Sequence, residues 1–382
     1  MSGELAFAAV YRHYRRYAVL SLVICILLVP VSDAVIIQRD RNRNMVYGEL
    51  FWQIGLGVYG LTDHDLNVTY HAPADHMLTG VLNVTYEYPV ITLLFYAVLA
   101  LIEPGIFGPS HYIANIVLVG LAHVNVLLFL YIGQGNWDKR WFRQLAALYY
   151  VFGLGYSIGF AKAEPLADMF LLVSIVLLRG GSLLKANALL GVAVQTKLYP
   201  VLAFPVFAAA GPLASISFFV SMAALSLPLL MTGMGYTSLL AHLSNSPSYS
   251  TIITNPFYVG LGATNPLALL APASLVIAFL YCVLETRTVH RIPVPVPRLR
   301  SRSWLSVYLF ALPLVLMCFS WVLIWYYSWF IPFALMLKTP EEMSRYRWMI
   351  AALWIAHSVG IIMNLDYFMT GPIAEFFGHL RS

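Results

Sequence analysis

Long apolar runs recur from one end of the chain to the other, and they constrain the fold more than any other feature. Hydrophobic residues make up 60% of the 382 positions and charged residues only 10%, whereas soluble domains carry about 25% charged residues. A transmembrane β-barrel would instead show alternating segments of about ten residues. We therefore predict an all-α polytopic membrane protein in which residues 1–382 form a single transmembrane domain.

Charge and cysteine usage argue against several other classes of protein. The formal net charge of +5 comes from basic residues scattered among short loops, which is not the clustered pattern of a nucleic-acid-binding surface. Cys25, Cys282 and Cys318 are isolated in or beside apolar runs, so they predict neither a disulfide framework nor a metal site. We expect no nucleic-acid partner, no cofactor and no metal.

The distribution of Lys and Arg predicts the topology, because cytoplasmic loops are enriched in these residues. We expect about eleven spans, with the N-terminus cytoplasmic and the C-terminus outside. In this arrangement sixteen of the 22 Lys and Arg residues lie in cytoplasmic loops. For residues 183–210, one broken helix is the alternative to two spans. The expected spans are 17–37, 111–134, 144–161, 165–179, 183–196, 198–210, 213–232, 264–284, 304–322, 325–338 and 346–365.

The first outer loop, residues 38–110, differs from the other loops in length and charge. The stretch from Ser32 to Pro104 holds eight of the seventeen acidic residues. Its two apolar runs, about 45–59 and 88–103, are shorter than the roughly twenty residues needed to cross a bilayer. If the second run crossed, the basic loop at 138–143 would lie outside. We therefore predict that both runs form interfacial helices.

Polar residues gather at the outer ends of the predicted spans. Charged groups near hydrocarbon are costly, and they are candidates for functional roles. In the predicted topology these outer polar residues converge on one aromatic-rimmed cavity, and no comparable set of polar residues lies on the inner side. The outer set comprises Asp33, Asp40, Lys162, Glu164, Asp168, Gln195, Lys197, Tyr199, His242 and the aromatic run 325–330.

Each candidate also has a purely structural interpretation. Lys162 and Glu164 could pair with each other, Asp40 could lie in a solvated charged turn, and the run 325–330 could be an interfacial aromatic belt. Lys197 stands in an apolar run with no acidic residue near it in sequence, and a buried lysine needs an anion. These residue types suit transfer from a lipid phosphate, in which cations hold the phosphate and a carboxylate accepts the proton of an acceptor hydroxyl.

These residues resemble a known family, the C-type (GT-C) glycosyltransferases that use polyprenyl-phosphate sugars. Within it, the likeness is to the catalytic subunit of GPI mannosyltransferase I and to bacterial polyprenol-phosphate-mannose-dependent mannosyltransferases. It covers most of the chain in order, and the segment Gly191–Pro200 is its most specific part. The other matching segments are Val46-Tyr47 with Gly55–Tyr59, Tyr86–Pro89, Ala241–Leu243 and Tyr326–Trp329.

The resemblance implies a GT-C-like bundle with two interfacial helices in the first outer loop. It also implies inverting transfer of a hexose, mannose by analogy, from a polyprenyl or dolichyl phosphate to a lipid or glycan hydroxyl on the outer face. Asp40 would be the general base. The remaining roles would be phosphate binding by Lys197, Tyr199 and His242, and sugar or acceptor binding by Glu164, Gln195, Tyr326 and Tyr327.

The chain departs from the family at the first acidic motif. Members carry Asp-x-Asp or a single Asp before the first interfacial helix, whereas this chain has Asp40-Arg41-Asn42. Asp33 and Glu49 therefore remain alternative bases, and the missing second acid argues against a divalent metal. Two other functions stay open, namely a transporter or flippase and a non-catalytic subunit of a glycosyltransferase complex. The need for a small membrane partner subunit is also open.

Overall fold

The computed structural model of the chain is helical throughout its described part, as the sequence predicts. The one β-type contact within that part is an isolated antiparallel bridge between Thr62 and Thr85. The structure describes residues 3–35, 39–72, 85–103, 112–159, 161–233, 235–236, 239, 255–256, 303–316, 322, 324–337 and 339–363.

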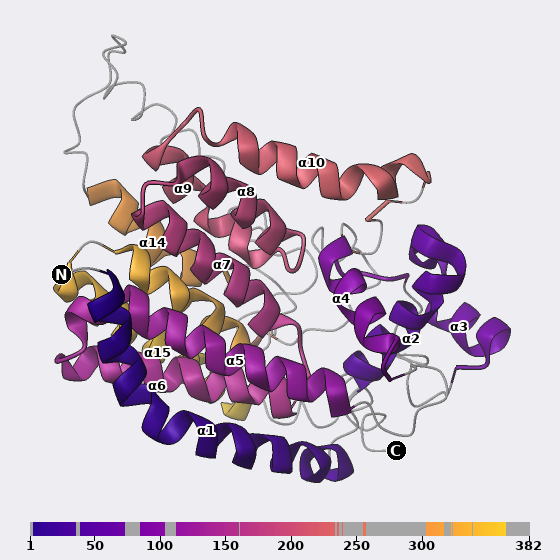
Figure 1. The fold of residues 1–382 in the computed structure, drawn as a ribbon, viewed down its shortest axis with the longest axis horizontal. Coiled ribbons are helices and arrows are strands. Elements are labelled where there is room, and N and C mark those ends of the chain that lie inside the picture. Colours follow the sequence, from indigo (N-terminus) through magenta and orange to yellow (C-terminus); the bar gives the residue numbers. More distant parts are fainter. Residues whose placement is uncertain are drawn as a thin grey trace.

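Four helices from the first half of the chain build one side of a bundle (Figure 1). They are α1 (Gly3–Val35), α5 (Tyr112–Ile132), α6 (Arg140–Leu154) and α7 (Glu164–Arg179), and a π-helical turn, η4 (Gly155–Gly159), extends α6. The apolar composition of α5 leaves it buried between α1, α6 and α7. Three of these helices closely match predicted spans, because their apolar runs are bounded by charged or glycine-containing turns.

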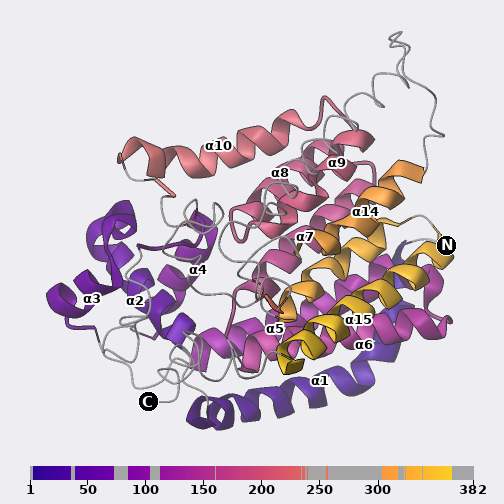
Figure 2. The same cartoon turned by 180° about the vertical axis from the view of Figure 1, so that it is seen from behind.

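The C-terminal half completes the bundle with more irregular elements. Helices α14 (Ser303–Val315) and α15 (Pro340–Met363) flank two 3₁₀ segments, η8 (Ile324–Phe330) and η9 (Pro332–Met336). Figure 2 shows α14 and α15 beside α5, α6 and α7. The predicted span 325–338 is therefore not one α-helix, and Pro332, which lacks a backbone donor, marks the start of its second segment. The predicted span 264–284 lies outside the described residues.

Residues 183–210 form an antiparallel hairpin with two short arms. The first arm is α8 (Leu183–Val194), and the second combines the 3₁₀ segment η5 (Tyr199–Ala203) with α9 (Phe204–Ala210). A Cβ added to Gly211 would lie 2.7 Å from the side chain of Leu183, so the second arm returns to the start of the first. A single broken helix is thereby excluded, although neither arm reaches the roughly twenty residues of a membrane crossing.

Helix α10 (Ile216–Met231) packs along α8. The two helices come closest at Gly191, where an added Cβ would lie 2.9 Å from the Cβ of Ser221. Phe218 and Leu229 are the two buried residues of α10, whereas large apolar side chains elsewhere on it, such as Phe219 and Leu230, are exposed.

The first loop folds into a compact unit at one end of the bundle (Figure 1), which we call the outer module. It consists of α2 (Arg39–Ile54), the 3₁₀ turn η1 (Gly55–Gly60), α3 (Asp63–Tyr70) and α4 (Val90–Ala100). The two runs predicted as interfacial helices, 45–59 and 88–103, are helical, and their location at a membrane interface stays a prediction. The first of them starts six residues earlier than predicted, because polar residues 39–44 are helical as well.

Buried polar groups hold the outer module together. The Arg43 guanidinium donates to the Asp63 carboxylate over 2.7 Å, and both side chains are fully buried. The Tyr47 hydroxyl donates to the Leu61 carbonyl (3.0 Å), and the Tyr86 hydroxyl donates to Asn44 (2.8 Å). The solvated turn considered for Asp40 is therefore wrong, because Asp40 lies in helix α2 and pairs with Lys162, and the neighbouring Arg43 is buried.

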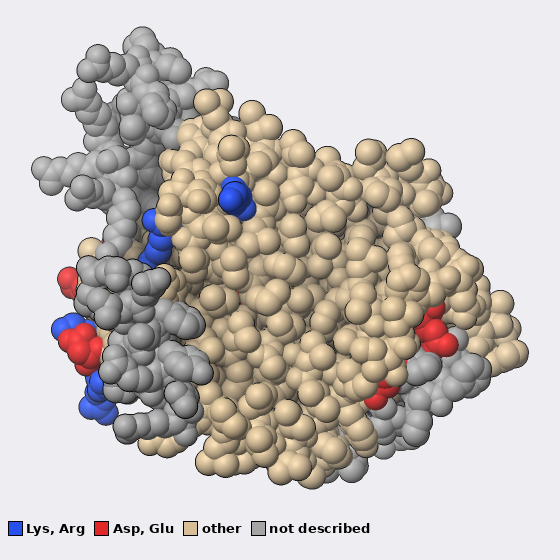
Figure 3. All heavy atoms as spheres, in the orientation of Figure 1, with Lys and Arg blue, Asp and Glu red and all other residues tan. Residues whose placement is uncertain are grey.

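Large apolar side chains are exposed along α1, α10 and α15, and they include Leu20, Met231 and Trp354. Within the described part of the chain, Tyr112–Ile132 and Pro340–Met363 are long and apolar enough to cross a membrane, judged by length and composition. On the face drawn in Figure 3, Lys and Arg lie toward the left, acidic residues occur at both ends, and a broad uncharged surface separates the ends. The count of eleven spans remains a prediction.

We expect Gly48→Ala to destabilise the protein, because α2 and α4 touch at this residue. An added Cβ would lie 2.6 Å from the backbone carbonyl carbon of Tyr96 and 2.7 Å from the backbone nitrogen of Ala97, and overpacking costs about 1–3 kcal/mol. Gly120→Ala on α5 is the control, because its Cβ would meet no atom within 4 Å. A thermal unfolding midpoint that falls for Gly120→Ala but not for Gly48→Ala would contradict this packing.

Candidate functional site

The candidate site forms where the outer module meets the break between α8 and η5. Helix α8 ends at Val194, so its last carbonyl groups lack partners within the helix. The Gln195 carbonyl accepts a hydrogen bond from the Ile91 backbone N–H (2.9 Å), and the Thr196 carbonyl accepts one from the Thr92 hydroxyl (2.5 Å). The first turn of α4 thus caps the end of α8 and brings Tyr88 next to Lys197.

Lys197 is paired with an acidic residue that its sequence surroundings do not reveal. Its Nζ lies 2.7 Å from a carboxylate oxygen of Glu164 at the start of α7. The same Nζ lies 5.3 Å from the ring centre of Tyr88 and 5.9 Å from that of Trp329, within the range of cation–π attraction. The second carboxylate oxygen of Glu164 is buried and has no hydrogen-bond partner among the described residues.

Asp40, the predicted base, makes the other ion pair of the site. It lies in the first turn of α2 and contacts Lys162, which precedes α7. The two side chains are 21% and 17% exposed, so both remain accessible at the edge of the site. Burial and the nearby charge of Lys197 lower the pKa of Lys162 to about 7, whereas the carboxylate of Glu164 acts in the opposite direction.

Aromatic rings from η8 and η5 line the site beside Lys197. The Trp329 ring stacks between those of Tyr326 and Tyr199, with centroid distances of 3.9 and 4.9 Å. The Trp329 indole nitrogen is buried without a hydrogen-bond partner among the described residues. The Tyr199 hydroxyl donates to Asp168, which fixes the orientation of the stack. Such a surface can contact the apolar face of a sugar ring while its indole N–H binds a hydroxyl.

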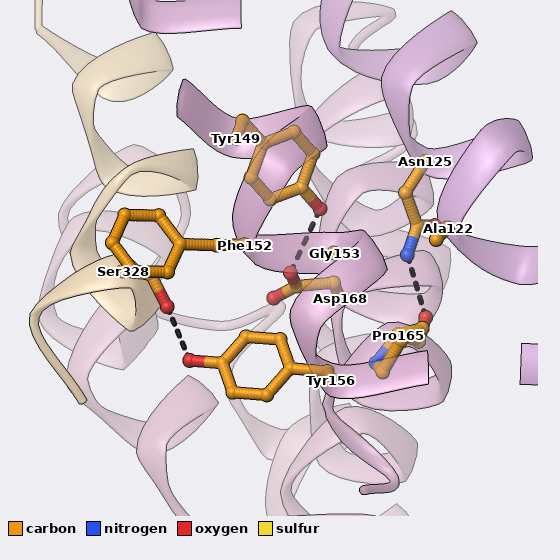
Figure 4. Close-up of a pocket in the computed structure, with 9 residues that line it drawn as sticks. All are labelled: Ala122, Asn125, Tyr149, Phe152, Gly153, Tyr156, Pro165, Asp168 and Ser328. Carbon is orange, nitrogen blue, oxygen red and sulfur yellow. Dashed lines mark hydrogen bonds between the residues drawn. The ribbon is translucent and has the colours of Figure 1, made fainter. Parts of the chain in front are cut away.

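A small pocket lies one helical turn deeper in the bundle (Figure 4). Asp168, one turn after Glu164 on α7, accepts hydrogen bonds from Tyr149 (2.8 Å) and Tyr199. The Tyr156 hydroxyl points at that of Ser328 across the pocket. Because Asp168 is already engaged by two phenols, its clearest role is to position Tyr199. The complete lining is Ala122, Asn125, Tyr149, Phe152, Gly153, Tyr156, Pro165, Asp168 and Ser328.

Two further predicted binding residues are engaged in packing contacts. The Gln195 side chain donates to Ser226 (2.6 Å) and accepts from the Tyr236 hydroxyl (2.9 Å), which ties α8 to α10. Tyr327 is fully buried, and its hydroxyl lies 3.4 Å from His357 on α15. Its hydroxyl is therefore directed at α15. Neither Gln195 nor Tyr327 is part of the charged cluster.

The alternative bases occupy other places. Glu49 follows Asp40 on α2 by about two and a half turns, so it projects from the opposite side of that helix. Asp33 is in the last turn of α1, and its side chain lies outside the described part of the structure. His242, predicted to bind phosphate, also falls outside the described residues. Of the two candidate bases whose side chains the structure describes, Asp40 and Glu49, Asp40 is the one paired with Lys162.

Lys162 and Trp329, which the sequence placed in the outer set without assigning them a role, belong to the site, and so does Tyr88, which that set lacks. Lys162 was considered as a partner of Glu164, but the observed pairs are crossed, with Lys162 on Asp40 and Lys197 on Glu164. Tyr88 and Trp329 lie inside the motifs of the family resemblance, which therefore could have indicated them.

The charged cluster contains two carboxylates and two ammonium groups. Within the described part of the chain, no three His, Cys, Asp or Glu residues are arranged to hold a metal ion. Lysines next to an aromatic surface can bind an anionic ester, and an adjacent carboxylate can accept a proton. Comparisons with models of protein families, with curated proteins and with solved structures find no match to this chain.

We expect the Lys197–Glu164 pair to behave as a coupled unit in unfolding experiments. Lys197→Met alone leaves a carboxylate that is 1% exposed without its cation, and breaking a buried pair costs about 3–5 kcal/mol. Lys197→Met combined with Glu164→Gln should therefore be more stable than Lys197→Met alone. A double-mutant cycle measured by unfolding of the purified protein tests this, and purely additive effects would contradict the pair.

Proposed function

We propose that this chain is a membrane-embedded inverting glycosyltransferase. It would transfer a hexose, mannose by resemblance to the GT-C enzymes, from a polyprenyl or dolichyl phosphate to a hydroxyl of a lipid or glycan. The observation that carries the proposal is the convergence of Asp40, Lys162, Glu164 and Lys197 beside an aromatic surface. These residues come from segments far apart in the chain, yet they supply the groups that this reaction requires.

In the proposed reaction, Lys197 acts on the leaving group and Asp40 acts on the acceptor. An acceptor hydroxyl attacks the anomeric carbon of the sugar while the bond from that carbon to the phosphate oxygen breaks. Lys197 stabilises the growing negative charge on the prenyl phosphate leaving group, and Asp40 takes the proton from the acceptor hydroxyl. Trp329 and Tyr326 offer a stacking surface to the sugar, and the unpartnered Glu164 oxygen accepts from a sugar hydroxyl.

A membrane location is part of the proposal and is supported by the exposed surface. Large apolar side chains on α1, α10 and α15 are exposed, and large exposed apolar patches mark sites of membrane or protein contact. A lipid-linked donor would enter from the bilayer, and its apolar chain would lie against such helices. The outer module would then lie on the outer face of the membrane, with the α5–α6 turn on the cytoplasmic face.

We expect Asp40→Asn to abolish sugar transfer while leaving the fold intact. Loss of a general base lowers turnover by about 10²–10⁴-fold. The assay is transfer of radiolabelled mannose from a short-chain polyprenyl phosphate mannose to a total lipid extract by the purified protein. The matched control is Asp65→Asn, which makes the same chemical change at the helix cap of α3, outside the cluster, and should retain activity. Chelator should have no effect.

The alternatives predict other outcomes in the same assay. Activity that survives Asp40→Asn would move the base to Asp33 or Glu49. No product from the wild-type protein with any prenyl phosphate sugar would contradict the proposed activity and favour a transporter or a non-catalytic subunit. Solute uptake into proteoliposomes would then separate these two.

The proposed orientation predicts which positions a membrane-impermeant reagent can reach. Val68→Cys lies on the outer module, where Val68 is 56% exposed, and Lys139→Cys lies at the α5–α6 turn, where the Lys139 side chain is 51% exposed. In sealed cells a charged maleimide should label Val68→Cys and not Lys139→Cys, and permeabilisation should make both reactive. Labelling of Lys139→Cys in intact cells would contradict the orientation.

A further inference from the structure

The predicted base is not available for catalysis in the state seen here. The Asp40 carboxylate contacts the Lys162 ammonium, and a neighbouring positive charge makes a carboxylate a weaker proton acceptor. A general base must also lie within hydrogen-bond reach of the proton that it accepts, and the ammonium occupies that position. The Asp40–Lys162 pair must therefore open before Asp40 can accept a proton from the acceptor hydroxyl.

The backbone holds Lys162 in place at some energetic cost. Ala161, the residue before it, has a positive φ of 45°, a conformation that costs a residue with a side chain about 1–2 kcal/mol. The Tyr96 hydroxyl donates to the Ala161 carbonyl (3.0 Å), and the Lys162 N–H donates to the Tyr156 carbonyl (2.8 Å). Strained residues that are held by several contacts tend to cluster at functional sites, so this turn merits a functional explanation.

The two lysines form a single electrostatic unit. The charge of Lys197 acts on Lys162, as noted above, and each lysine is offset by a different carboxylate in the structure. Two neighbouring ammonium groups can bind one phosphate ester if its oxygens replace the carboxylates that pair with them in this structure. The ester gains negative charge when the sugar leaves, so it would bind more tightly as the reaction proceeds.

We propose that Lys162 is a second phosphate-binding residue and that its ion pair with Asp40 is a resting-state lock. The phosphate of the lipid-linked donor takes Lys162 from Asp40 and joins it to Lys197, which frees the Asp40 carboxylate for the acceptor. The base thus becomes active once the donor is bound. This inference rests on the proposed transferase function, and it assigns to Lys162 a role that the family resemblance did not indicate.

The exchange predicts opposite effects of two substitutions on the binding of polyprenyl phosphate, the product that lacks the sugar. Asp40→Asn removes the competing anion, so binding should become tighter, by about tenfold. Lys162→Ala removes a cation, so binding should weaken by about tenfold. The double variant Asp40→Asn with Lys162→Ala should not bind polyprenyl phosphate more tightly than the wild type. Affinity is measured by titrating full-length protein in nanodiscs with a short-chain polyprenyl phosphate.

Three controls guard the interpretation. Lys185→Ala, at the first turn of α8 and away from the cluster, removes the same charge and should leave affinity unchanged. Lys162→Arg keeps the charge and should retain most of the affinity, which a general loss of folding would not allow. Inorganic phosphate as competitor separates recognition of the phosphate alone from recognition of the lipid-linked ester, and we expect it to compete only weakly.

The outcomes distinguish failure of the lock from failure of the function. Unchanged or weaker binding by Asp40→Asn would overturn the lock even if mannose transfer is observed. Tighter binding by Asp40→Asn, together with no transfer by the wild-type protein from any donor, would support the exchange at a prenyl phosphate site and overturn the transferase function. Equal affinity of wild type and Lys162→Ala would remove Lys162 from the site.

Discussion

The arrangement of the site depends on the contact between two helix ends. Helix α8 ends inside the protein, where water cannot satisfy its carbonyl groups, and the first turn of α4 supplies the missing donors through Ile91 and Thr92. This contact joins the outer module to the bundle just before Lys197, which follows the end of α8. It also places the Tyr88 ring next to the Lys197 ammonium. The hydrogen bonds between the two helix ends therefore also position the charged cluster.

The charged cluster is balanced by two crossed ion pairs. Asp40 and Lys162 lie at its edge, while Glu164 and Lys197 lie deeper against the aromatic stack of Tyr199, Trp329 and Tyr326. Neither carboxylate is paired with its sequence neighbour, and each pair bridges separate elements. Such pairs fix the geometry of the cluster in the absence of ligand, and a phosphate could replace both carboxylates as the anion.

The sequence predicts the bundle better than the site. The all-helical class follows from the apolar runs, and α5 and α7 lie within a few residues of their predicted ranges because polar or glycine-containing turns bound them. The start of α2 was missed because Arg41 and Arg43 look like a solvated turn until their buried partners, Asn115 and Asp63, are known. The number of spans stays a prediction, because several apolar helices are shorter than the roughly twenty residues of a crossing.

For the site, local sequence identified most of the charged and aromatic residues but not their pairing. Asp40 and Lys162 are separated by most of the first loop and two helices, and no periodicity predicts that they meet. The polar side chains of Gln195 and Tyr327 looked equally available, yet they hold α8 to α10 and η8 to α15. Which polar groups pack and which remain accessible is decided by tertiary contacts, which the sequence alone does not show.

The most direct test of this account is an experimental structure of the full chain in nanodiscs with a bound polyprenyl phosphate. The account predicts phosphate density within ion-pair distance of Lys162 and Lys197, with the Asp40 carboxylate turned away from Lys162. Phosphate bound elsewhere, with both crossed ion pairs intact, would contradict the assignment of this cluster as the reaction centre.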